Sequence, residues 1–177
     1  GAVTQNVAAL LNIYSADGSA YGNYSISDTA AAVAAANGTD AGLSNFATAV
    51  TLSTDATIAD AANLEGITLK GGGGIAYNVT GTATLLAAAN AADMSAAVNL
   101  IASDDATVAE AVTITAFNNS GTTTYGISDA IADFIDANAD NQALNNAAVE
   151  AASGTVTATG NATVAQAEVV SALTKAV

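Results

Sequence analysis

Side-chain oxygens alternate along "DANADNQALNNAAVE", which covers residues 136–150. Asp136, Asn138 and Asp140 lie two residues apart, as do the first ligands of an EF-hand calcium loop. The turn glycine and the bidentate Glu of that motif are both missing from this stretch. The pattern is therefore consistent with a calcium site at these three residues or, alternatively, with a turn whose Asn and Asp residues end helices.

A second candidate is the glycine run "KGGGGIAYN" at residues 70–78, where Lys70 precedes four glycines. A phosphate-binding loop has the reverse order, with its Lys after the glycines and a Ser or Thr directly behind that Lys. The sequence therefore predicts a turn or an insertion here and no phosphate site.

Catalytic side chains are scarce. The chain has no His and no Cys, and its two basic residues are Lys70 and Lys175, so Arg is absent too. A histidine base, a thiolate nucleophile and a zinc site of the usual kind are thereby excluded. Paired carboxylates could still serve a glycosidase. We expect the acidic residues to cap helices instead, and we predict no enzyme activity, no catalytic residue and no cofactor other than a candidate calcium ion.

The charge is strongly unbalanced, with 16 acidic and two basic residues and a formal net charge of −14. Nucleic acid and anionic membrane surfaces repel such a chain. No segment approaches 18 consecutive apolar residues, so we expect no membrane insertion. The expected partners are neighbouring repeats or copies of the chain itself, with calcium and surface glycans as further candidates.

The helices and strands that would position the candidate residues are encoded by a sequence repeat. The heptads "DATIADA", "DATVAEA" and "NATVAQA" begin at residues 55, 105 and 161, and each places Asp, Glu or Gln three residues after a Thr. That spacing predicts a capping box at the start of a helix. The strands "YSISD", "YNVTG" and "YGISD", at residues 24, 77 and 125, alternate with these heptads. The period is thus near 50 residues, with two strand–helix units in each repeat.

Within the Tyr-led strands, Asp28 and Asp129 are predicted as N-caps of the helices that follow, and Gly81 with Thr82 forms a weaker cap. The Tyr residues occupy the same place in each copy. They predict either a shared packing position or a ladder of rings that stacks on sugars.

Short β-branched runs alternate with Ala-rich helical runs, and one expected strand is "GITLKG" at residues 66–71. This order favours parallel strands joined by helices. We predict a solenoid-like α/β array with a parallel sheet and one helical layer, or alternatively a compact two-layer α/β domain. Residues 1–177 form a single repeat domain with three repeats, near 1–65, 66–118 and 119–177.

The combination "YSISDTAA … VTLSTDATIADA" resembles the Ala/Thr-rich tandem repeats of very large exported proteins of cyanobacteria and other aquatic bacteria. There such repeats accompany calcium-binding nonapeptides and type I secretion, although no "GGxGxD" nonapeptide occurs in this chain. The resemblance implies a non-enzymatic spacer module of an extracellular adhesin, S-layer-like or matrix protein at the cell surface. We expect self-assembly as a further property, because the terminal units of a cut array leave apolar faces and strand edges uncapped. The alternative is an adhesion module that binds carbohydrate or calcium.

Overall fold

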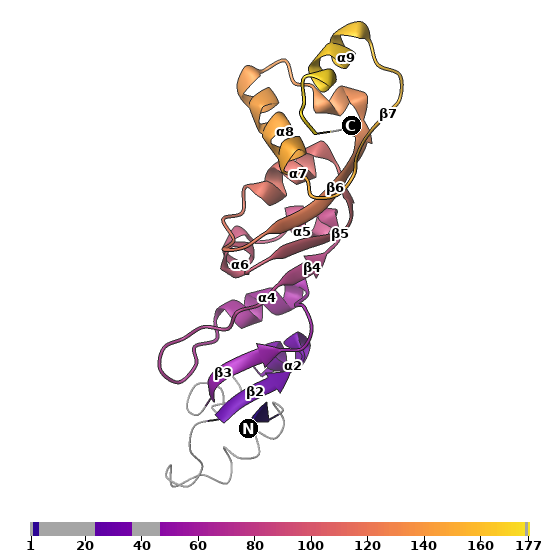
Figure 1. Ribbon diagram of the computed structural model, residues 1–177. Coiled ribbons are helices and arrows are strands. Elements are labelled where there is room, and N and C mark those ends of the chain that lie inside the picture. Colours follow the sequence, from indigo (N-terminus) through magenta and orange to yellow (C-terminus); the bar gives the residue numbers. More distant parts are fainter. Residues whose placement is uncertain (1, 4–23, 37–46, 176) are drawn as a thin grey trace, which may run out of the picture.

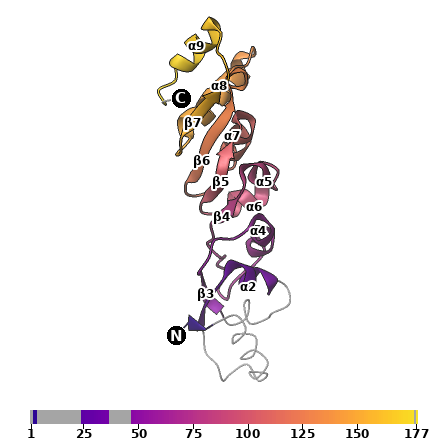
Figure 2. The ribbon, with the colours of Figure 1, turned by 90° about the vertical axis from the view of Figure 1, so that its right-hand side faces the viewer.

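The computed structural model describes residues 2–3, 24–36, 47–175 and 177 of the chain. The molecule is elongated, and its two ends lie at opposite ends of the long axis (Figure 1). Strands run along one side, and helices α2 to α8 lie along the other (Figure 2). The fold is therefore α/β with two layers, as the alternation of strand and helix patterns predicts.

All strand pairs in the described part of the chain are parallel, and each strand pairs with the one before or after it in the sequence. One sheet has the order β1-β2-β3 and the other β4-β5-β6-β7. A single bridge between Ala56 and Val79 links the region after β3 to β4. The strands are β1 (Ala2–Val3), β2 (Tyr24–Asp28), β3 (Ala47–Leu52), β4 (Val79–Gly81), β5 (Leu100–Ala106), β6 (Thr123–Ala130) and β7 (Val156–Thr159).

Helices follow the strands, and we call a strand with the helices behind it a strand–helix unit. Helices of successive units contact each other: α2 packs on α4, α4 on α6, α5 on α7, and α7 on α8. The helices are α2 (Ala30–Ala35), α4 (Ile58–Glu65), α5 (Ala83–Ala87), α6 (Ala91–Ala96), α7 (Val108–Thr115), the 3-10 helix η1 (Ile131–Phe134), α8 (Ala139–Ala151) and α9 (Val164–Ser171).

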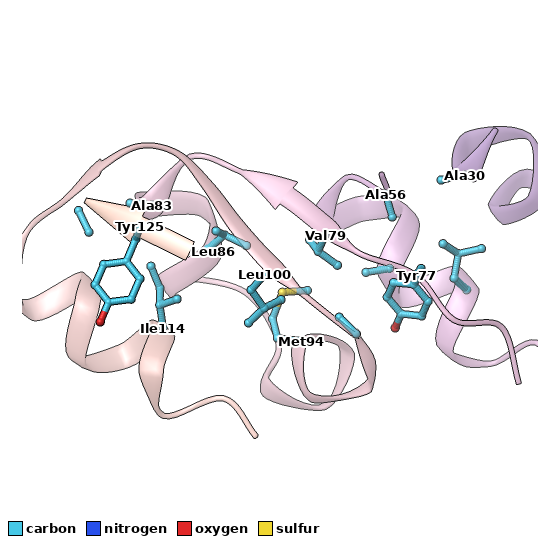
Figure 3. Packing of buried hydrophobic residues seen from close by; sticks show 14 of the residues in the cluster. Ala30, Ala56, Tyr77, Val79, Ala83, Leu86, Met94, Leu100, Ile114 and Tyr125 are labelled. Atoms are coloured by element: carbon cyan, nitrogen blue, oxygen red, sulfur yellow. The ribbon is translucent and has the colours of Figure 1, made fainter. Parts of the chain in front are cut away.

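The core lies between the two layers and continues from one unit to the next (Figure 3). Strand residues such as Val79 and Leu100 meet helix residues such as Leu86 and Ile114, all fully buried. Many of the remaining core positions are Ala, which lets helices and strands approach closely. Regular packing of small side chains replaces the large aromatic anchors that this sequence lacks.

Two elements differ from the expectation. Residues 66–71 form no strand, although Ile67 and Leu69 are buried as the alternating pattern requires. The Leu69 amide donates to the Gly73 carbonyl at 2.7 Å within the turn, while the Lys70 amide donates to the Ala47 carbonyl of β3 at 2.9 Å, so the segment contacts the sheet without forming a strand ladder. The Ala-rich run "ATLLAAANAAD" at residues 83–93, one of the helical runs expected from the sequence, is divided between α5 and α6, because the Asn90 side chain accepts from the Ala92 amide at 2.9 Å and starts a second helix.

Candidate functional site

The predicted calcium ligands lie together in the turn that begins α8. Asn138 is the N-cap of this helix, and its Oδ1 accepts from the amides of Asp140 at 2.9 Å and Asn141 at 3.2 Å. Asp136 Oδ1 accepts from the Asn138 amide at 2.8 Å, and Oδ2 accepts from Asn141 Nδ2 at 3.1 Å. The oxygens of Asp136 and Asn138 thus hold the turn and the helix start, as the turn interpretation of this stretch expects.

Gln142 closes this turn from the other side. Its Oε1 accepts from the Asp136 amide at 2.7 Å, while its Nε2 donates to the Phe134 carbonyl at 3.0 Å. A shallow hollow of about 280 Å³ lies beside the turn and is lined by Asp129, Asp133 and Asp136, among others. Over the residues that the structure describes, no group of three or more His, Cys, Asp or Glu side chains is arranged to hold a metal ion. Calcium binding at Asp136, Asn138 and Asp140 therefore stays a prediction.

The glycine run forms an exposed turn, as predicted. Gly71 and Gly72 have positive φ angles of 98° and 86°, which side-chain-bearing residues rarely adopt. No helix begins directly after the glycines, because the chain continues to β4 and the next helix is α5. The arrangement thus differs from a phosphate-binding loop, in which the glycines lead into a helix start.

Two of the recurring Tyr residues are buried. The side chains of Tyr77 and Tyr125 are 4% and 2% exposed, and their hydroxyls donate to the carbonyls of Asp93 at 3.2 Å and Ala148 at 2.6 Å. Burial raises the pKa of both phenols to about 12, with nearby carboxylates adding to the effect at Tyr77. These two rings share a packing position, which confirms the structural interpretation, and neither is available to stack on a sugar.

The three predicted capping boxes are confirmed. Thr107 Oγ1 accepts from the Glu110 amide at 3.2 Å, and Glu110 Oε2 accepts from the Thr107 amide at 2.9 Å. The same reciprocal pair joins Thr57 to Asp60 and Thr163 to Gln166. The bonds to Glu110, led by the one from the Thr107 backbone, lower the pKa of its carboxyl. The repeated heptads are therefore helix starts.

The predicted N-cap role of Asp28 and Asp129 is wrong. Thr29 is the N-cap of α2, and Ala130 is the N-cap of η1 without a side-chain bond. Within its own unit, each Asp accepts from the amide directly after it, at 2.8 Å, and not from the second or third amide of the helix as an N-cap would. Each Asp lies directly before the cap position, so Thr29 occupies the place that the sequence interpretation gave to Asp28. In the middle copy Thr82 is the cap, as expected beside Gly81.

The strand-end oxygens cap the helix of the preceding unit, which the sequence interpretation missed. Asp129 Oδ2 accepts from the first helical amide of α7, that of Val108, at 2.9 Å. In the same way, Asp104 accepts from Ala83 at 2.7 Å and Thr54 from Ala30 at 3.1 Å. The donor and acceptor lie 21 to 24 residues apart in the sequence. The sequence signal that could have predicted these bonds is a residue with a side-chain oxygen 21 to 24 positions after each helix start.

A second polar connection crosses the units through Asn78 and Asn99, which lie directly before β4 and β5. Asn99 Nδ2 donates to Asn78 Oδ1 at 2.8 Å, and Asn78 Nδ2 donates to Asp55 Oδ1 at 3.1 Å. Asn99 Oδ1 in turn accepts from the Thr122 amide at 2.8 Å. Side-chain hydrogen bonds thereby link four successive units, in addition to the backbone hydrogen bonds between the strands.

Most of the side-chain hydrogen bonds described above are made to backbone amides or to a neighbouring unit. They can therefore hold one unit against the next. No helix in the described ranges is both long and apolar enough to cross a membrane. In the comparisons with known proteins, no family model, no curated protein and no solved structure matches this chain.

Proposed function

We propose that this chain is a non-enzymatic structural spacer module of an extracellular bacterial surface or matrix protein. In this proposal, residues 1–177 form an α/β solenoid of three repeats, each with two strand–helix units. The observation that carries the proposal is the strand order: within each of the two described sheets the strands follow one another in sequence order and pair in parallel, and the bridge between Ala56 and Val79 joins the two sheets, so each described unit lies against the unit before it. An open stack of this kind accommodates any number of copies.

The contacts between units support a mechanical role. Strand-end oxygens cap the preceding helix at Val108, Ala83 and Ala30, so tilting one unit against the next would break a cap as well as packing. The bonds of Asn78 and Asn99, which lie directly before β4 and β5, add a second restraint between units. With a formal net charge of −14, copies of the rod repel each other at long range. Such a rod holds other domains away from a surface.

The absence of enzyme activity is supported by what the acidic side chains do. Asp60, Glu110, Asp104 and Asp129 are engaged in helix caps. The extracellular location rests on the resemblance of "YSISDTAA" and "VTLSTDATIADA" to the tandem repeats of exported bacterial proteins.

The stiffness of the rod tests this proposal. The chain has no Cys, so Ser27→Cys and Thr157→Cys, both at exposed strand positions, allow one specific pair of fluorescent labels. We expect a single narrow distance distribution in single-molecule energy transfer, unchanged between low and physiological salt. A control pair at Thr124→Cys and Thr157→Cys, on neighbouring strands, calibrates the width that label linkers add. A broad or salt-dependent distribution for the long pair would exclude a stiff spacer.

An adhesion module that binds calcium or glycans is the alternative function. It is favoured by the three carboxylates, Asp129, Asp133 and Asp136, around the hollow beside the α8 turn. A specific calcium site would raise the melting temperature in millimolar calcium relative to chelator, and Asp136→Asn would abolish the rise. Asp60→Asn, at a capping box far along the chain, is the matched control. Equal melting temperatures in calcium and in chelator would exclude a specific calcium site and would favour the spacer function.

A further inference from the structure

Two of the three α9 side chains that correspond to buried positions of α7 are exposed to solvent, and the third, Val170, is half-buried. By their place in the heptad, Val164, Ala167 and Val170 correspond to Val108, Ala111 and Ile114. The three α7 side chains are 1%, 0% and 0% exposed, whereas Val164 is 78% exposed and α9 has no buried residue. The apolar side of this helix is therefore largely exposed to solvent in α9, whereas it is buried in α7.

In α7 this side is covered by the next unit. Strand β6 and helices η1 and α8 all contact α7. Asp129 at the end of β6 caps the amide of Val108, the first residue of α7. The α7 surface is thus an interface between two units, and α9 carries the same residue types for the corresponding interface.

Two further features extend this surface beyond α9. Within the described sheet, β7 is an edge strand that pairs with β6 alone, so its outer edge can accept a parallel strand. An open hollow of about 400 Å³ lies against α9 and is lined mainly by apolar side chains, among them Ile131, Val170 and Leu173. We call α9, this hollow and the outer edge of β7 the docking face.

We propose that the docking face binds one further strand–helix unit of the Tyr-led kind. This proposal deepens the spacer function, on which it rests, by naming the partner of one end of the stack. The strand of that unit adds in parallel to β7, its Tyr and Ile side chains enter the core, and the Asp two residues after the Ile caps the Val164 amide. The interface is continuous with the one between α7 and β6.

The kind of unit follows from the alternation within the chain. Helices α4 and α7, which begin with capping boxes, are both followed by Tyr-led segments, those of Tyr77 and Tyr125. Among the described strands, a second copy of this chain offers no free Tyr-led one, because β2, β4 and β6 each have neighbours on both sides. The occupant is therefore an additional Tyr-led unit, and the 177-residue chain by itself stays monomeric.

The test extends the chain after Val177 with a second copy of residues 122–152, which contain β6, η1 and α8. Val177 corresponds to Gly121 in the heptad spacing, so the added strand begins where β6 begins relative to α7. Amide hydrogen exchange of Val164 is measured by NMR, with Val108 in the same sample as the reference for a folded interface. We expect exchange at Val164 to slow at least about tenfold on extension and to approach that of Val108.

Two matched extensions separate docking from a general effect of added chain. In the first, Asp129→Ala is made in the added copy only. The Val164 amide should then exchange rapidly again, while the Val170 amide, which the docked unit also covers, stays as protected as in the unsubstituted extension. With a copy of residues 154–177, which carries a capping-box helix and no Tyr-led strand, both should exchange as in the original chain.

Unchanged exchange at Val164 in the extended chain, with Val108 still protected, would overturn the proposal. Protection of Val164 in the original chain, together with a dimer mass in sedimentation, would also overturn it by making a second copy the occupant. Neither outcome depends on the label distances that test the spacer function. A failed docking face and a failed rod are therefore distinguishable.

Discussion

Asp129 at the end of β6 accepts a hydrogen bond from the amide of Val108, the first residue of the helix in the unit before it, at 2.9 Å from Oδ2. The amide is one of those that a helix start leaves without an intrahelical partner. Because the acceptor belongs to the next unit, α7 completes its N-terminus only when β6 is in place. Capping here is a contact between units, so the folding of neighbouring units is coupled.

Asp129→Ala should therefore destabilise the protein by about 1–2 kcal/mol, because it removes a charged acceptor from a helix start and leaves the amide partly buried. Asp129→Asn, which keeps one oxygen, should lose less. Urea unfolding followed by circular dichroism measures both. Asp133→Asn, at an exposed position in η1, is the control and should change stability by less than about 0.5 kcal/mol. Equal losses at the two positions would show that the bond to Val108 contributes nothing.

The helix starts and the parallel strand order could be predicted from the sequence, because both depend on local patterns. A Thr with Glu three residues later specifies a capping box within one helical turn, and the Thr107–Glu110 pair forms as expected. Strands alternating with helices allow few topologies, and the parallel one is observed.

The contacts between units could not be predicted in the same way. Asp129 lies directly before the cap position, so the local pattern assigns it to its own helix, and only the stacking of β6 beside α7 brings it to Val108. The strand expected at residues 66–71 failed for a related reason. Its alternation predicts correctly that Ile67 and Leu69 are buried, but Leu69 bonds within the glycine turn, and the bond from Lys70 to β3 does not extend into a strand ladder.

Acid should weaken the protein partly through Glu110. Its hydrogen bonds, led by that from the Thr107 amide, lower its pKa in the folded state below the ordinary 4.5. A lowered folded-state pKa contributes stability above pH 4.5 that is lost as the pH falls from there through the folded-state value. Glu110→Gln cannot titrate and retains an acceptor, as Gln166 does in the third box. We expect the urea midpoint of this variant to fall less between pH 5 and pH 3 than that of the parent chain. Parallel pH profiles for the two chains would contradict this assignment.

Alkali should act through the buried phenols. Burial raises the pKa of Tyr77 and Tyr125 from 10 to about 12, so both favour folding below pH 10 and lose that contribution as the pH rises toward 12. In absorbance titration, their ionisation should appear only near pH 12 or on unfolding. Tyr125→Phe, which removes a 2.6 Å bond to the Ala148 carbonyl, should cost about 1 kcal/mol. Tyr77→Phe, which removes the longer 3.2 Å bond to Asp93, is the comparison and should cost less. A full ionisation of all Tyr residues near pH 10 in the folded protein would exclude the buried environment.

The close approach of successive units should make Gly121 irreplaceable. A Cβ at this position would lie 2.7 Å from the Val98 carbonyl oxygen and 2.4 Å from Asn99 Oδ1, the oxygen that accepts from the Thr122 amide. The first of these atoms belongs to backbone and cannot turn away, so Gly121→Ala must push the two units apart. We expect a loss of about 1–3 kcal/mol in urea unfolding, the usual range for overpacking a close contact.

Gly73→Ala is the matched control, since nothing lies within 4 Å of its added Cβ and its φ is not positive. Its stability should stay unchanged or rise by up to about 1 kcal/mol, because Ala has less freedom in the unfolded chain than Gly. If the two substitutions have equal effects, the units do not approach as closely at Gly121 as the 2.7 Å separation requires. A large loss at Gly121 alone ties stability to the spacing between units, on which a stiff stack depends.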